Sequence, residues 1–228
     1  MRYVQSLLVL CLFAVNAAAA EPVVIKQLKF DNTWTTDSDL VKIVANNPEL
    51  VELTLGHTKI TDAGLAPLKK LTKLRKLRIC NNTAITDTAA ETLAAIPSLQ
   101  DIDVSQTSLG NTGLAALKTL PNLKRLNLYT TAVTDSGLDA FAEFKSAEKL
   151  TWLNIDKCSI TDAAAAKLAP LKNLQWIHFG RTGLTDAGLE VLSRYKTLKE
   201  ISVTNTKVTP AGVEKFKAAL PECKVNAK

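Results

Sequence analysis

Few side chains in this 228-residue chain could act as a nucleophile or a base. The chain has two histidines and four cysteines, and Asp31, His57 and Cys80 follow one another in an order that could mimic a Cys–His–Asp arrangement. Such an arrangement also needs an oxyanion hole and a sheltered pocket, and no motif in the sequence supplies either. The cysteines and carboxylates also lack the spacing of metal ligands. We therefore predict that the chain is not an enzyme and that it holds no metal and no cofactor.

Aromatic residues flanked by polar ones offer a different chemistry, that of recognition. Trp152 and Trp176 are two of the three tryptophans, and Tyr129 precedes them at a similar interval. Exposed aromatic side chains surrounded by polar groups are typical of binding sites. The candidate partner-binding residues are Arg125, Asn127, Tyr129, Trp152, Asn154, Asp156, Lys157, Trp176, His178 and Arg181.

A repeated unit must position these residues. Residues 50–71 read LVELTLGHTKITDAGLAPLKKL, and similar copies begin at Leu74, Leu99, Leu123, Leu150, Leu174 and Leu198, with a degenerate copy near Ile25. A fixed period of 24 to 27 residues indicates a stacked solenoid.

Each copy predicts one strand and one helix. In the first full copy, Leu53 and Leu55 alternate with polar residues, which favours a short strand with one buried face. Leucines at helical spacing follow. Between the two elements Thr61 is a good N-cap, and Asp62 places a negative charge near the positive end of the helix dipole. The Thr-Asp pair recurs in most copies, and Pro67 and Pro170 predict that their two helices are short or distorted.

The pattern LxxLxLxxTxITDxGLxxL resembles the leucine-rich-repeat superfamily, and in particular its cysteine-containing subclass, with Thr in the Cys column. That column is expected to hold Thr33, Thr58, Thr83, Thr107, Thr131, Cys158, Thr182 and Thr206. The resemblance implies an α/β solenoid of about eight repeats, with a curved parallel sheet on the inner, concave side and short helices outside. It also implies a binding scaffold. Some members of the subclass are substrate receptors of ubiquitin ligases, a role that we expect less here because no F-box precedes the first repeat.

Both ends of the chain depart from the repeat. Residues 1–20 read as a signal peptide, with Arg2 as the charged region and Ala18-Ala19-Ala20 as a cleavage site, so residues 21–228 form the leucine-rich-repeat domain. A retained anchor is the alternative. We expect an exported monomer, periplasmic or extracellular at the cell surface, with no membrane span after cleavage. The residues from Leu220 to Val225 resemble half a repeat that covers the last edge.

The charge of the chain is +6, with 28 basic and 22 acidic residues. Most lysines fall on the predicted helices or the turns after them, so we interpret them as a solvated outer surface and predict no nucleic-acid partner. On the strands, Lys76, Asp101 and Arg125 alternate in sign, as do Arg78 and Asp103. These residues indicate a self-neutralising ladder of exposed charges.

The predicted function follows from the aromatic group. Neighbouring strands place residues of one column about 5 Å apart, so the candidate residues should gather on the concave face. We predict a module that binds a protein through this face. Two alternatives stay open: the site binds an extracellular polysaccharide or glycan, or the aromatic residues form a cross-strand pair that only stabilises the sheet.

Overall fold

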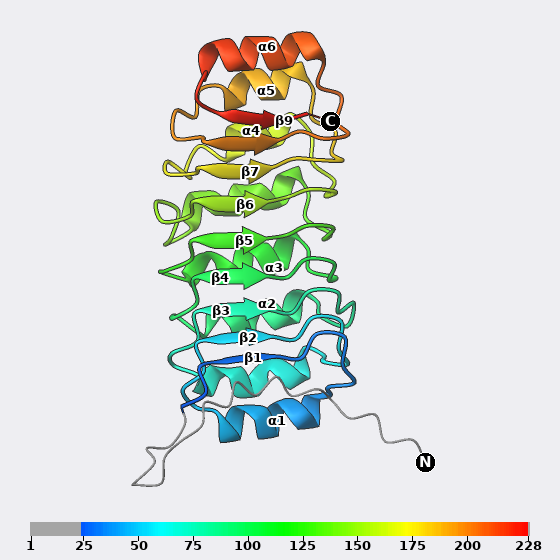
Figure 1. The fold of residues 1–228 in the computed structure, drawn as a ribbon, viewed down its shortest axis with the longest axis vertical. Coiled ribbons are helices and arrows are strands. Elements are labelled where there is room, and N and C mark those ends of the chain that lie inside the picture. The colour runs from blue at the N-terminus through cyan, green and yellow to red at the C-terminus, as the bar shows by residue number, and fades with distance from the viewer. Residues whose placement is uncertain (1–23, 228) are drawn as a thin grey trace, which may run out of the picture.

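A computed structural model describes residues 24–227. The predicted signal peptide lies outside these residues. Nine parallel strands form one sheet and follow one another in chain order (Figure 1). The strands are β1 (Gln27–Lys29), β2 (Glu52–Thr54), β3 (Lys76–Arg78), β4 (Asp101–Asp103), β5 (Arg125–Asn127), β6 (Trp152–Asn154), β7 (Trp176–His178), β8 (Glu200–Ser202) and β9 (Lys224–Asn226).

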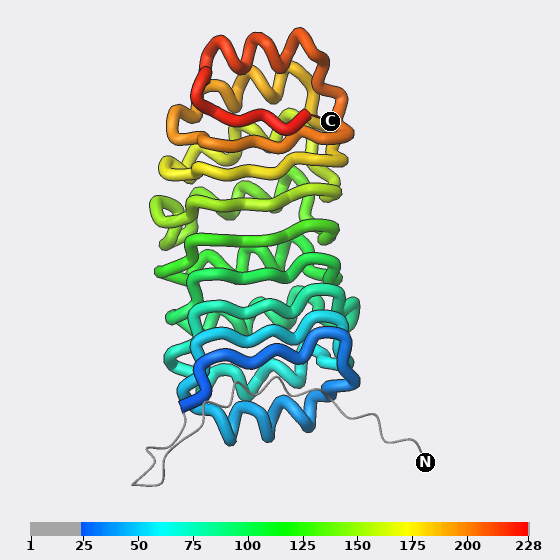
Figure 2. Tube along the Cα trace, in the orientation of Figure 1, coloured from blue at the N-terminus to red at the C-terminus, as the bar shows by residue number. Residues whose placement is uncertain are grey.

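The second layer consists of short helices behind the sheet. Its α-helices are α1 (Asp37–Asn46), α2 (Asp87–Ala94), α3 (Asn111–Ala116), α4 (Ala163–Lys167), α5 (Asp186–Leu192) and α6 (Pro210–Ala219). Its 3-10 helices are η1 (Ala63–Lys70), η2 (Leu117–Thr119) and η3 (Asp135–Glu143). In Figure 2 each coil of the trace runs forward through a strand and returns behind it. The predicted leucine-rich-repeat solenoid is therefore confirmed.

The register of the strands is the one that the leucine columns predict. Leu53 of β2 pairs with Leu77 of β3, and Leu126 of β5 pairs with Leu153 of β6. All four side chains are fully buried between the two layers. Because side chains alternate across a strand, the residues on either side of each leucine point away from the helices. We call the surface that they form the sheet face; it is the face that the sequence predicts to be concave.

The two prolines act on their helices as expected. Pro67 lies inside η1, which is a 3-10 helix. Helix α4 spans five residues and ends at Lys167, before Pro170. A proline lacks the N–H that an α-helix needs at an interior position, which agrees with both outcomes, although η3 is a 3-10 helix without a proline.

The threonine column contains one error of prediction. Thr107 and Thr131 are buried, and each donates its hydroxyl to the carbonyl three residues earlier. In the copy that contains β3, however, Asn82 is buried in this place and Thr83 is exposed. The Asn82 amide donates to the Leu55 and Ile79 carbonyls. Asn82 follows Arg78, the last residue of β3, at the same interval as Thr58 follows Thr54 of β2, so the asparagine occupies the column and the extra residue comes after it.

Cys158 occupies the same column in its repeat. It is buried, and its thiol donates to the Leu128 carbonyl of the preceding repeat at 3.1 Å. Burial raises the pKa of Cys158. Cys80, Cys158 and Cys223 are all free thiols.

The predicted N-cap role of the Thr-Asp pair holds for Thr185, whose hydroxyl accepts the Ala187 N–H. It is wrong for Thr61, because η1 has no side-chain cap and the Thr61 hydroxyl donates to Asp37 of the preceding repeat.

The pair has a second role, between repeats. Asp162 accepts hydrogen bonds from the backbone N–H and the hydroxyl of Thr185, one repeat later, both at 2.7 Å. Asp62 and Asp186 accept the same two bonds from Thr86 and Thr209. Each aspartate therefore joins the start of its own helix to the start of the next, and the motif stabilises the stack as well as the single helix.

This role predicts that Asp162→Ala lowers the free energy of unfolding by about 2 kcal/mol, because two hydrogen bonds to a charged acceptor are lost. Asn111 stands at the equivalent position of its repeat and still accepts from the Thr134 N–H at 2.9 Å. Asp162→Asn should therefore lose less than half as much in urea denaturation. If the two variants are equally unstable, the bonds to Thr185 are not what Asp162 contributes.

The two ends of the solenoid differ. The predicted half repeat forms a ninth strand, β9, which pairs with β8, and Leu220 and Cys223 are buried beneath it. At the other end Trp34 is 80% exposed and Val41 of α1 is 53% exposed. Within residues 24–227, no helix combines the length and the apolar character that crossing a membrane requires.

Candidate functional site

The predicted binding residues gather on the sheet face over β5, β6 and β7. In register, Trp152 lies between Arg125 and Trp176, and Asn154 lies between Asn127 and His178. The remaining predicted residues, Tyr129, Asp156, Lys157 and Arg181, lie in the turns that follow these strands. The structure thus brings all ten together, and we call them, together with Lys199, the aromatic patch.

Each tryptophan of the patch contacts a cation. The Arg125 guanidinium lies 4.4 Å from the centre of the Trp152 ring, and the Lys199 ammonium lies 5.5 Å from that of Trp176. His178 lies 5.4 Å from Trp152 with its ring tilted by 51°. Cations are attracted to the negative face of an aromatic ring. The two half-buried tryptophans are therefore neighbours in register, and each ring is held by a basic side chain.

Lys199 is the one patch residue that the sequence analysis missed. It directly precedes Glu200 of β8, which pairs with Trp176. The signal in the sequence is a lysine directly before the strand that pairs with the strand of Trp176.

Arg181 connects the aromatic and acidic parts of the patch. Its guanidinium lies 5.4 Å from the centre of the Tyr129 ring and 3.7 Å from the Asp156 carboxylate. Asp156 is only 7% exposed. Burial raises the pKa of this carboxyl, although the Gly180 N–H, His178 and Arg181 act in the opposite direction.

A glycine allows Asp156 to sit so deeply. The Gly180 N–H donates to Asp156 Oδ1. A Cβ added to Gly180 would lie 2.9 Å from Asp156 Oδ2 and 2.7 Å from the Thr204 hydroxyl. Any other residue at this position would push the carboxylate away, so Gly180 is part of the shape of the patch.

Two amides point donors outward from the patch. The Asn127 side-chain oxygen accepts the Tyr129 N–H at 3.1 Å, and that of Asn154 accepts the Asp156 N–H at 2.9 Å. These bonds orient both amides, and in the described part of the chain neither Nδ2 group donates to a protein acceptor. The patch therefore offers fixed aromatic edges, oriented amide donors and three ring-held cations.

Thr130, next to Tyr129, is strained. Its φ is 54°, a left-handed conformation that is rare for β-branched residues, and its hydroxyl oxygen is buried without a hydrogen-bond partner among the described residues. Asn32, Asn81 and Asn205 occupy the same position in other repeats with similar φ values.

We therefore expect Thr130→Asn to stabilise the protein by about 1 kcal/mol, because asparagine tolerates this conformation. The midpoint of urea denaturation measures the change. Thr131→Val serves as the control and should destabilise, since the Thr131 hydroxyl donates to Leu128 at 2.8 Å and valine has no donor. An unchanged or lower midpoint for Thr130→Asn would show that the position carries no strain.

The charged residues of the predicted ladder form ion pairs between neighbouring strands. Arg78 pairs with Asp103 at 3.0 Å and Arg125 with Asp101 at 3.4 Å, as the charge ladder predicts, whereas Lys76 pairs with Glu52 at 3.8 Å.

The possible Cys–His–Asp group does not have the character of a catalytic site. His57 is exposed, and its Nδ1 lies 3.0 Å from the Asn32 side-chain oxygen. Burial is the largest cause of a raised pKa for Cys80. Nucleophilic cysteines have a lowered pKa, and the shift of Cys80 is in the opposite direction. Among residues 24–227 no group of three or more His, Cys, Asp or Glu side chains could hold a metal ion.

Comparisons with known proteins agree with the architecture. A family model described as "Leucine Rich repeat" matches residues 46–69. The chain is similar to the crystal structure of internalin C2 from Listeria monocytogenes, with 23% identity and a TM-score of 0.69 over 90% of this chain and 81% of that one. It is also similar to the internalin inlF of the same organism, with 19% identity and a TM-score of 0.52 over 88% of this chain and 66% of that one. A search of curated proteins finds no match.

These likenesses describe the fold and leave the ligand open, because the same scaffold carries many different sites. The repeated motif, the nine-stranded sheet and the family match agree with one another. This chain therefore has the leucine-rich-repeat fold.

Proposed function

We propose that this chain is an exported protein-binding module that recognises its partner through the aromatic patch on the concave sheet face. The leucine-rich-repeat fold suggests a protein–protein interaction module. The observation that carries the proposal is the set of three cation–ring contacts, Arg125 on Trp152, Lys199 on Trp176 and Arg181 on Tyr129. Tryptophan, tyrosine and arginine are the residues that most often dominate the energy of a protein interface.

The contacts also lower the cost of binding. An arginine or lysine that is free in solution loses side-chain entropy when a partner immobilises it. Here rings already restrict the cations, and the Asn127 and Asn154 amides are oriented by backbone N–H groups. Carboxylates of the partner would then meet cations that are already in place.

A glycan is the second candidate ligand. The Trp176 ring and the Asn127 and Asn154 amide donors favour it, since sugars stack on aromatic rings and hydrogen-bond to amides. A sugar needs an open ring face, however, and Arg125 covers one face of Trp152 while His178 is tilted against the same ring. For this reason we propose a protein partner.

An experiment with the immobilised protein distinguishes the two ligands. Extracellular extract is passed over the wild-type protein and over the variant Arg125→Ala with Arg181→Ala. We expect retention by the wild type alone. Trypsin treatment of the extract should abolish that retention, and periodate oxidation of glycans should leave it unchanged. If periodate abolishes retention and trypsin does not, the patch binds a glycan. If the variant retains as much of the extract as the wild type, the binding site lies elsewhere.

A further inference from the structure

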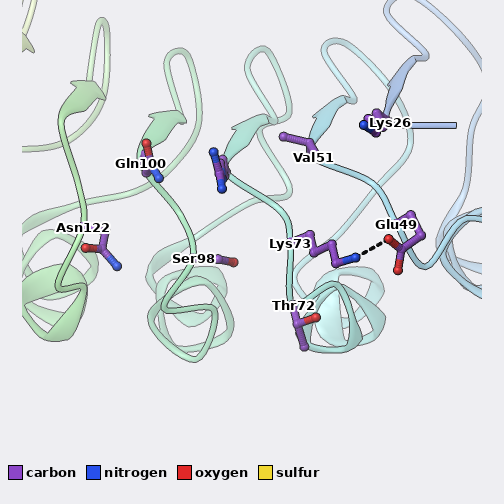
Figure 3. A pocket seen from close by; sticks show the side chains of 9 residues that line it. Lys26, Glu49, Val51, Thr72, Lys73, Ser98, Gln100 and Asn122 are labelled. Atoms are coloured by element: carbon purple, nitrogen blue, oxygen red, sulfur yellow. Dashed lines mark hydrogen bonds and ion pairs between the residues drawn. The ribbon is translucent and has the colours of Figure 1, made fainter. Parts of the chain in front are cut away.

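A second surface lies at the edge of the sheet where each strand begins, and its charged residues are not part of the aromatic patch. A groove of 580 Å³ runs along this edge over the first repeats (Figure 3). Its lining includes Lys26, Val51, Arg75 and Gln100, each of which directly precedes a strand. In Figure 3 Lys26 and Gln100 lie at the strand ends, and Ser98 and Asn122 lie below them.

Hydrogen bonds place these residues in one column. The Val51 N–H donates to the Lys26 carbonyl, the Arg75 N–H to Val51, the Gln100 N–H to Arg75 and the Lys124 N–H to Gln100, each at 2.8 Å. The column therefore reads Lys26, Val51, Arg75, Gln100, Lys124, with a cation on every second strand. Adjacent strands are about 4.8 Å apart, so successive cations are spaced by about 10 Å.

The three cations are available to a ligand. Lys26, Arg75 and Lys124 are exposed, and within residues 24–227 none of them forms an ion pair. Glu49 is the one acid in the lining, and it is paired with Lys73. The neighbouring strand acids, Glu52 and Asp101, are paired with Lys76 and Arg125. The edge therefore keeps a positive charge that its neighbours do not neutralise.

Val51 and Gln100, which lie between the cations, indicate the chemistry of the ligand groups that separate its negative charges. Val51 offers a small apolar surface, and the Gln100 amide has no protein partner among the described residues. Such a pair suits the C–H face and the hydroxyl groups of a neutral sugar. In an extended glycan that carries one acid per disaccharide, the carboxylates recur at a distance similar to two strand spacings.

We propose that this edge is a second binding site, which takes a linear glycan with one carboxylate per disaccharide. The carboxylates pair with Lys26, Arg75 and Lys124, and the neutral sugars cover Val51 and Gln100. A nucleic acid fits less well, because each strand carries a phosphate about every 3.4 Å and cations spaced by about 10 Å would leave most phosphates unpaired. The site meets the aromatic patch at β5, where Lys124 directly precedes Arg125, but Lys26 and Arg75 lie at β1 and β3, away from the patch.

A hyaluronan decasaccharide is a suitable probe, because it carries one carboxylate per disaccharide. We expect calorimetry at low salt to show binding that weakens as salt is added. Lys26→Gln with Arg75→Gln and Lys124→Gln should lower the affinity by at least about tenfold, since three exposed ion pairs are lost. The control Lys69→Gln with Lys70→Gln and Lys217→Gln, which removes the same charge from the helix side, should bind like the wild type.

A swapped variant tests the spacing itself. Arg75→Gln with Gln100→Arg preserves the net charge but moves the middle cation by one strand. It should bind the decasaccharide several-fold more weakly than the wild type. Binding equal to that of the wild type would overturn the spacing argument. Absence of decasaccharide binding by the wild-type protein, or equal binding of single-stranded DNA or of phosphatidylglycerol vesicles, would overturn the proposal.

This test is independent of the function proposed for the aromatic patch. A variant with Trp152→Ala and Trp176→Ala should bind the decasaccharide as the wild type does. If that variant loses decasaccharide binding and the triple edge variant keeps it, the glycan binds to the aromatic patch and the edge is not a site.

Discussion

Replacing Leu126 or Leu153 with alanine is expected to lower the free energy of unfolding by about 2–5 kcal/mol. Both side chains are fully buried, and they are paired in register in the middle of the sheet. The loss combines the transfer of apolar surface with the cavity that remains, because neighbouring repeats on both sides hold the space open. Urea denaturation followed by circular dichroism measures the change.

Position in the stack provides the control. Leu28 occupies the same column in β1, but it is only partly buried and has a neighbouring repeat on one side. In a solenoid each repeat is stabilised by its own packing and by its interfaces with its neighbours. Leu28→Ala should therefore cost less than half as much as Leu126→Ala. A loss below about 1 kcal/mol for Leu126→Ala would mean that the side chain is not a member of the core.

Repetition explains why the sequence predicts so much of this fold. A single LxL pattern is weak evidence for a strand, but the same pattern at a constant period predicts the register, and the pairing of Leu53 with Leu77 confirms it. The error at Thr83 arises where the period changes. The extra residue lies between the column and Ile85, so counting back from the helix selects Thr83, whereas counting forward from β3 selects Asn82. The hydrogen bonds of the Asn82 amide show that the second count is right.

The same limit applies to the Thr-Asp motif. Its recurrence is visible in the sequence, where it indicates a helix start within one repeat. The bonds from Thr185 to Asp162 cross between repeats, so they become visible only when the copies are stacked.

The sequence predicts which strands carry the site and which of their residues lie side by side on the sheet face. Alternation along a strand places Trp152 and Trp176 on the same face and side by side in register, as found. The partner of each ring was not predictable, because it depends on side-chain rotamers. Arg125 and Lys199 take the positions beside the rings, and Lys199 lies outside the strand pattern from which the site was deduced.

Replacing both patch tryptophans with alanine is expected to abolish binding of the partner. Each ring presents a large, half-buried apolar surface and holds a cation in place, so the variant loses contact area and releases Arg125 and Lys199 at the same time. Truncating one dominant interface residue costs about 2 kcal/mol or more, which makes the double change worth about a thousandfold in affinity. The cost to folding should be about 1 kcal/mol, because the rings lie outside the leucine core.

The third tryptophan provides a matched control for this variant. Trp34 is more exposed than either patch tryptophan and also contacts a cation, the Lys59 ammonium at 5.0 Å, but it lies in the first repeat, far from the patch. Trp34→Ala should leave binding unchanged, as should Lys69→Glu with Lys70→Glu on the helix side. Affinity for the captured partner is measured by surface plasmon resonance, and melting temperature by calorimetry. If Trp34→Ala removes binding and the patch variant keeps it, the partner binds to the exposed first repeat. The contacts of Arg125 with Trp152 and of Lys199 with Trp176 then only stabilise the sheet.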